Sequence, residues 1–195
     1  EQAFSDRYGL FAQRDEQVYS TAVVLWAFLA QTLRDGKGAS CGAAVADIAT
    51  YANQIGGSSP CGDTGDYCRA RAKLNLPALR ELVTMTADGL QSQVDPDWLW
   101  LGRHVKLVDG FDFTMADTPE NQRIFPQQPV QKQGLGFPIA RACAVLSLAT
   151  AAVHGVAVGP YLGKQTGESA LLRDLLDLFQ PGEVALFDRS FCSYM

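Results

Sequence analysis

The hydrophobic positions along the first half of the chain recur at helical spacing. Ser20 can cap a helix, because the apolar residues that follow it recur every three or four positions. The same pattern predicts a second helix over residues 43–55, and Asn75 can cap a third. We therefore expect residues 18–93 to be mostly helical.

Beyond Asp95 the pattern changes to short apolar runs, which are typical of strands. These runs lie at residues 98–101, 105–108, 140–148, 153–158 and 184–187. A long polar loop is predicted over residues 111–136, and an amphipathic helix over residues 167–179, with Glu168 in its first turn. The order strand, strand, strand, helix, strand predicts a mixed sheet with a crossover helix. We assign the chain to the α/β (α+β) class, with a helical region at 1–95 and a sheet domain at 96–195.

Composition narrows the class of protein. The chain has 195 residues and a net charge of −5, which counts against a generally basic nucleic-acid binder but leaves room for a local basic groove. Its five cysteines are odd in number and form no CxxC pair, so we expect reduced thiols rather than a zinc site. The sequence shows no signal peptide and no apolar run long enough to cross a bilayer. We expect a soluble, cytoplasmic protein with no membrane partner.

Two aspartates are the main candidates for chemistry. Asp109 follows the apolar run at 105–108, and Asp188 follows the run at 184–187. Acids at the carboxyl ends of neighbouring strands can share divalent metal ions, and carboxylates suit Mg²⁺ or Mn²⁺. The alternative is that each aspartate merely ends a strand and begins a turn, as Asp-Gly commonly does.

Other motifs give weaker indications. Residues 159–166 imitate a phosphate-binding loop, but the glycine spacing is one residue short and Gln165 separates Lys164 from the threonine. We therefore expect no nucleotide cofactor. Asp112 lies three residues after Asp109, where the aspartyl-phosphate phosphatases need two, and His154 lies in an apolar run typical of a core histidine.

The basic stretch at residues 67–73 is a candidate for contact with a nucleic-acid backbone. Its cations are Arg69, Arg71 and Lys73. A solvated helix face explains them equally well, and Lys164 has the same two interpretations.

Several motifs in the same order resemble the DDE transposases of the insertion-sequence-4 family. The motifs occupy residues 100–110, 115–122, 131–141, 159–168 and 188–194, with further similarity at 25–29 and 63–71. Together they cover nearly the whole chain from about residue 18.

The resemblance implies a ribonuclease-H-like core that is incomplete in this sequence. Asp109 would be the first metal-binding acid, on the first strand, and Asp188 the second, on the fourth. The resemblance implies Mg²⁺ (or Mn²⁺) as the cofactor. It implies DNA as the partner, both at the element ends and at the target, and it is compatible with a homodimer. Further cations in these motifs are candidate DNA contacts: Arg103, Lys132, Lys164 and Arg189.

The family's third acid is a glutamate on a later helix, and this sequence contains no such segment after Asp188. Glu168 and Glu183 precede Asp188, so neither is that residue by order. We therefore expect little or no strand transfer from these 195 residues. The alternatives are the front part of a longer transposase, and a non-catalytic remnant that binds DNA or dimerises and modulates a full-length enzyme.

Overall fold

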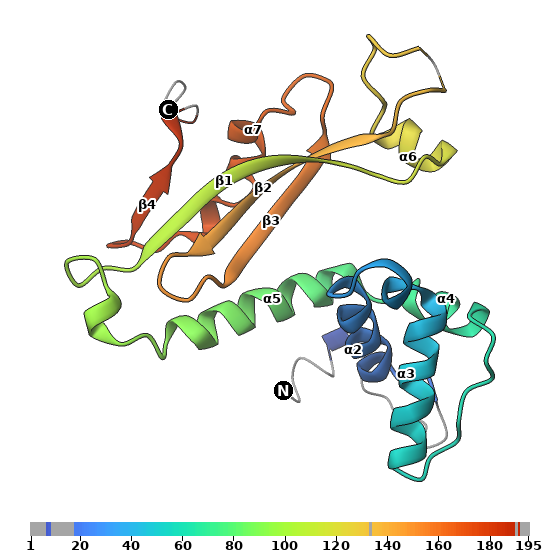
Figure 1. Cartoon of the computed structure of the whole chain (residues 1–195). Coiled ribbons are helices and arrows are strands. Elements are labelled where there is room, and N and C mark those ends of the chain that lie inside the picture. Colours follow the sequence, from blue (N-terminus) through green and yellow to red (C-terminus); the bar gives the residue numbers. More distant parts are fainter. Residues whose placement is uncertain (1–6, 9–17, 133, 190, 192–195) are drawn as a thin grey trace. The chain divides into compact units, whose positions relative to one another are not determined.

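The computed structural model describes residues 7–8, 18–132, 134–189 and 191, which form two compact units (Figure 1). The division between the units falls between Leu79 and Arg80, inside helix α5 (Leu76–Gln91). Each unit has its own hydrophobic cluster. In the part of the chain that the structure describes, no helix is long and apolar enough to cross a membrane.

The first unit is helical, as its periodicity predicts. Its elements are α2 (Thr21–Thr32), the 3₁₀ turn η1 (Gly36–Ala39), α3 (Cys41–Gln54), α4 (Gly65–Arg71) and the start of α5. The predicted caps are confirmed: the Ser20 hydroxyl accepts from the Val23 amide at 3.3 Å, and the Asn75 side chain accepts from the Ala78 amide at 3.0 Å. Each cap satisfies an amide that the first turn of its helix leaves without a partner.

The core of this unit is built where α2, α3 and α4 meet. Its buried side chains are Val24, Ala27, Ala44, Val45, Ile48 and Tyr67. Tyr67 is fully buried, and its hydroxyl donates to Gln31 Oε1 at 2.9 Å, so the phenol keeps a hydrogen-bond partner.

The second unit contains the predicted mixed sheet, in the order β3-β2-β1-β4. The strands are β1 (Val105–Thr114), β2 (Ile139–Ser147), β3 (Val153–Pro160) and β4 (Val184–Phe187). β1 and β2 are antiparallel, as are β2 and β3, whereas β4 runs parallel to β1. Between β3 and β4 lie α7 (Glu168–Arg173) and η3 (Leu176–Leu178), which form the crossover that a parallel pair requires (Figure 1).

The core of the sheet unit lies between the strands and α7. Leu171, Leu172 and Leu175 belong to one buried cluster with Val108 of β1, and the cluster is completed by Cys143, Val145, Ala157 and Phe191. Since Val108 lies on this covered face, the alternation of a strand places Asp109 on the other face.

Three details of the prediction are wrong. Residues 98–101 are not a strand: Pro96–Trp98 form the 3₁₀ turn η2, and the positive φ angles of Leu101 and Gly102 reverse the chain. The predicted helix over 167–179 ends at Arg173 and continues only as η3. The first strand does not stop before Asp109 but continues to Thr114.

The long loop between the first two strands therefore begins after Thr114, and it contains a short helix, α6 (Pro119–Ile124). Thr118 caps this helix by accepting from the Asn121 amide at 3.2 Å.

Candidate functional site

The parallel pairing of β1 with β4 relates the two candidate aspartates. The pairs run from Val105 with Val184 to Val108 with Phe187. One step further along both chains come Asp109 and Asp188, on strands that lie about 4.8 Å apart in such a ladder. Because matched positions of parallel strands face the same side, a continuation of this register beyond Val108 and Phe187 would direct both carboxylates to one face of the sheet. Figure 1 shows β4 beside β1.

Asp109 lies on the exposed part of β1. The burial of the strand changes from Val108, which is buried, to Asp109, which is exposed. The Gly110 amide donates to Asp109 Oδ1 at 2.8 Å, which leaves further oxygen lone pairs directed outward. A carboxylate held in this way can bind a hard cation.

A third carboxylate lies near this part of β1 but on the opposite face of the sheet, the face that α7 covers. Glu168, the first residue of α7, lies over Gly110 so closely that a Cβ added to the glycine would be 2.3 Å from the glutamate Cδ. Cys143 pairs with Gly110 across the sheet, and burial raises the pKa of its thiol to about 11, with further contributions from Glu168 and Asp109. The charges of Glu168 and Asp109 therefore both contribute to raising the pKa of the buried Cys143 thiol.

By its order in the chain, Glu168 is not the family's third acid, because that acid follows Asp188. The available signal was Gly110, since a glycine inside a strand often marks a close approach by another group. Among the described residues, no group of three or more His, Cys, Asp or Glu side chains is gathered closely enough to hold a metal ion. The candidate site is therefore limited to the two aspartates, and Glu168 lies on the opposite face of the sheet from Asp109 because Gly110 shares the face of Val108.

The donor set fits the cation that the resemblance implies. Carboxylate oxygens are the ligands that Mg²⁺ and Mn²⁺ prefer, and no soft thiolate lies exposed among them because Cys143 is fully buried.

The predicted DNA-contacting cations of the helical unit differ in their surroundings. Arg69 is exposed and pairs with Asp66 at 2.6 Å, and both residues line a groove together with Lys73. Arg71 is half-buried: its guanidinium donates to Gln31 Oε1 at 3.1 Å and lies 5.6 Å from the ring centroids of Phe28 and Tyr67. Arg69 and Lys73 are therefore presented outward, whereas Arg71 is held within the unit.

The cations of the sheet unit are divided between the two ends of the strands. Lys132, in the loop after β1, Lys164, in the connection after β3, and Arg189, after β4, all follow strands that point the same way. They therefore lie toward the edge of the sheet at which Asp188 leaves it. Arg103 precedes β1 at the opposite edge, where its guanidinium donates to the Gly182 carbonyl at 3.4 Å.

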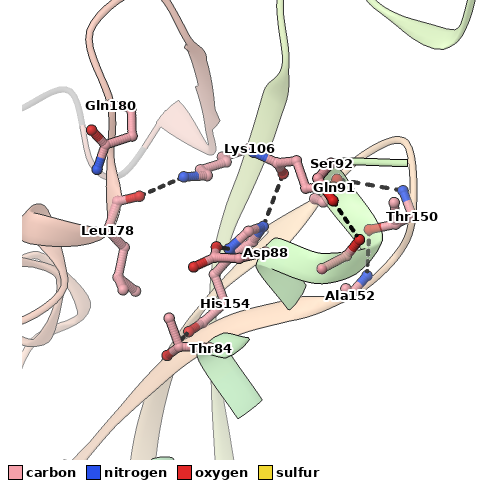
Figure 2. Close-up of polar contacts among 12 residues, drawn as sticks. Thr84, Asp88, Gln91, Ser92, Lys106, Thr150, Ala152, His154, Leu178 and Gln180 are labelled. Atoms are coloured by element: carbon pink, nitrogen blue, oxygen red, sulfur yellow. Dashed lines mark hydrogen bonds and ion pairs between the residues drawn. The ribbon is translucent and has the colours of Figure 1, made fainter. Parts of the chain in front are cut away.

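A buried polar network lies at that opposite edge (Figure 2). The Lys106 ammonium, whose side chain is 3% exposed, pairs with Glu183 at 2.8 Å and also donates to the Leu178 carbonyl. His154 Nε2 bonds to Gln91 Oε1 at 3.0 Å, and the histidine is 2% exposed. The prediction that His154 is a core histidine with a partner is confirmed.

Comparison with known proteins gives one informative similarity. The chain is 26% identical over 125 residues to Transposase InsG for insertion sequence element IS4 of Escherichia coli (strain K12). The aligned part is 64% of this chain, and the chain spans 27% of the length of that relative. No family model matches the chain, and no solved structure matches it.

Proposed function

We propose that this chain is a portion of an insertion-sequence transposase, carrying two of the metal-binding acids of a ribonuclease-H-like DDE domain. The observation that supports the proposal is the register of parallel strands β1 and β4, whose last pair, Val108 with Phe187, directly precedes Asp109 and Asp188. The similarity to an IS4 transposase supports the same class of protein. The protein would act in the cytoplasm, and its substrate would be DNA.

The roles of the residues follow from their chemistry. Asp109 and Asp188 would hold Mg²⁺ or Mn²⁺, and such an ion, when bound, activates the attacking oxygen and stabilises the leaving oxygen of a phosphodiester. Asp109 is fixed by β1 and by the Gly110 amide. Glu168 lies over Gly110 on the opposite face of the sheet and would take no part in holding the ion.

The cations at the same edge of the sheet are suited to the phosphate backbone. Lys132, Lys164 and Arg189 are exposed, and they lie on connections that follow the carboxyl ends of β1, β3 and β4. Lysine and arginine at such positions neutralise phosphates without reading sequence. In the helical unit, Arg69 and Lys73 would supply the corresponding contacts.

The decisive experiment is a titration of the protein with Mn²⁺, followed by electron paramagnetic resonance, for the wild type, Asp109→Asn and Asp188→Asn. We expect each substitution to weaken Mn²⁺ binding by at least about tenfold, because each removes one charged oxygen ligand. Asp112→Asn is the matched control: it lies on the same strand, faces the other way and pairs with Arg141 at 2.8 Å. Equal Mn²⁺ binding by all four proteins would refute the metal site.

A second measurement separates a catalyst from a non-catalytic DNA-binding remnant. A catalyst nicks supercoiled plasmid in the presence of Mg²⁺, and Asp109→Asn abolishes the nicking. A non-catalytic remnant binds DNA without nicking it, and Asp109→Asn leaves its DNA affinity unchanged. DNA affinity is followed by fluorescence anisotropy against salt concentration. The double variant Arg69→Ala/Lys73→Ala should reduce the salt slope by up to about 2, and Lys37→Ala, an exposed cation of η1, serves as control.

A further inference from the structure

Two cysteines of the helical unit lie close together. Cys41 is the first residue of α3 and Cys68 lies within α4, and their Sγ atoms are 3.7 Å apart although the residues are 27 positions apart in sequence. Both are thiols, and both are partly accessible to solvent. The pair therefore combines proximity with access to small reagents.

The surroundings of Cys41 favour its thiolate. Gln31 Nε2 donates to Cys41 Sγ at 3.7 Å, and Arg71 Nη1 lies 3.9 Å from the same sulfur. Cys41 also opens a helix of 14 residues, whose amino end carries partial positive charge. Burial acts to raise the pKa of Cys41, but the hydrogen bonds from Cys68 and Gln31 and the charge of Arg71 outweigh it and lower that pKa.

Cys68 has the complementary character. Its hydrogen bond to Cys41 raises the pKa of its thiol, and burial acts in the same direction. Cys41 is thus suited to attack an electrophile, and Cys68 is placed to react with the product.

We propose that Cys41 and Cys68 form a site of reversible oxidation by peroxides, closing to a disulfide between α3 and α4. The Cys41 thiolate attacks one peroxide oxygen, the O–O bond breaks, and protonation of the leaving hydroxide gives water and a sulfenic acid on Cys41. The Cys68 thiol then loses its proton as its sulfur attacks the Cys41 sulfur, the S–O bond breaks, and the leaving hydroxide takes up that proton to give the second water as the disulfide forms. The two thiols supply the two electrons that reduce the peroxide.

The required movement is small. A disulfide bond is about 2.05 Å long, so the sulfurs must approach by about 1.7 Å from their separation of 3.7 Å. The bond would join the first turn of α3 to α4. Since α4 also carries Arg71, whose guanidinium contacts Cys41, the bond forms where two helices already meet.

The other described cysteines lack this combination. Cys143 is fully buried in the sheet unit, and its pKa is raised to about 11 by burial first and then by Glu168 and Asp109. Cys61 is exposed, and no hydrogen bond or ion pair of its side chain is found among the described residues. The inference concerns the thiols alone and stands whether or not the proposed transposase function is correct.

The test treats the whole chain with hydrogen peroxide, blocks the remaining thiols by alkylation, and maps the peptides by mass spectrometry without reduction. We expect a peptide that joins Cys41 to Cys68, with the mass of two hydrogen atoms lost, and its disappearance on addition of dithiothreitol. In Cys68→Ser, Cys41 should stop at the sulfenic acid and be labelled by dimedone. In Cys41→Ser, oxidation of Cys68 should slow by about tenfold or more.

Cys61→Ser is the matched control, and it should form the joined peptide at the wild-type rate. Circular dichroism establishes that each variant is folded before treatment. The proposal is overturned if peroxide oxidises Cys61 before Cys41 and Cys68, if the bond formed joins two chains, or if Cys41 and Cys68 are oxidised separately without being joined.

Discussion

At the scale of single residues, the buried charges of the sheet unit are the most consequential. Lys106 and Glu183 have side chains 3% and 9% exposed, and they pair at 2.8 Å. Burial acts to raise the pKa of Glu183, but hydrogen bonds from Lys106, the Gln180 amide and Gln91 outweigh it and lower that pKa. Each charge is tolerated because the other compensates it.

We predict that Lys106→Met lowers the free energy of unfolding by about 3–5 kcal/mol, because it leaves the Glu183 carboxylate buried without its cation. Urea denaturation at pH 7 measures the loss. Lys106→Met/Glu183→Gln is the control, and it should recover a substantial part of the loss because the uncompensated charge is gone. A double variant no more stable than the single one would contradict this explanation.

His154 gives the unit a dependence on pH. Burial lowers the pKa of this imidazole, the Lys106 charge lowers it further, and Asp88 and Glu183 act in the opposite direction. The unfolded chain therefore takes up a proton at a higher pH than the folded chain does. The contribution of the neutral His154 to stability is fully present above the ordinary histidine pKa of about 6.5, and it is lost as the pH falls below that value.

We predict that the wild type loses stability between about pH 7 and pH 5 and that His154→Gln flattens this part of the profile. Thermal melts across that range measure the effect. Glutamine keeps a donor for Gln91, so the variant tests titration rather than the lost hydrogen bond. The pKa of Glu183 is lowered, so protonation of this carboxylate destabilises the fold only under more acidic conditions. Both proteins should therefore lose stability further below about pH 4.5. An unchanged slope between pH 7 and pH 5 in the variant would show that another group is responsible.

At the scale of elements, the local sequence pattern predicts most of the observed helices and strands. It fails where pairing with a strand distant in sequence determines how far an element extends. Ser20 and Asn75 cap their helices by contacts within three residues, so the sequence is sufficient to predict them. The pair Asp109-Gly110 is typical of a turn, yet β1 continues through it to Thr114. The reason is the pairing with β2, which extends to Thr114 with Ile139 and supplies partners for the backbone of β1.

The contact between β1 and α7 has a testable consequence at Gly110. We predict that Gly110→Ala lowers the free energy of unfolding by about 1–3 kcal/mol, because the new methyl group would lie 2.3 Å from Glu168 Cδ unless the glutamate moves. In the background of Glu168→Ser, the same Gly110→Ala change should be neutral or slightly stabilising, since alanine suits a strand better than glycine does.

A double-mutant cycle by urea denaturation measures this coupling. Gly89→Ala is a useful control, because nothing lies within 4 Å of the position of its added Cβ and the residue is inside α5, where alanine is favoured. Equal losses from Gly110→Ala with and without Glu168 would contradict the placement of that side chain.

At the scale of the whole molecule, the sequence orders the candidate acids but does not bring them together. Asp109 and Asp188 were identified from the apolar runs that precede them. Their neighbouring positions depend on the parallel pairing of β1 with β4, which is a long-range contact that no local pattern contains. The approach of Glu168 to Gly110, on the opposite face, is also a long-range contact, since it depends on how α7 packs on the sheet.

The two hydrophobic clusters predict that the chain has two separable stabilities. Ile48, 3% exposed, lies in the cluster of the helical unit, and Val145, fully buried, lies in the cluster of the sheet unit. Ile48→Ala removes buried methyl and methylene groups at a cost of about 2–5 kcal/mol. We expect it to raise amide hydrogen exchange in α2, α3 and α4 while the strands keep their protection, and Val145→Ala should do the reverse. Native-state exchange followed by mass spectrometry makes the comparison, because it reports local and global opening separately. If either substitution raised exchange equally in helices and strands, the two units would be one cooperative structure.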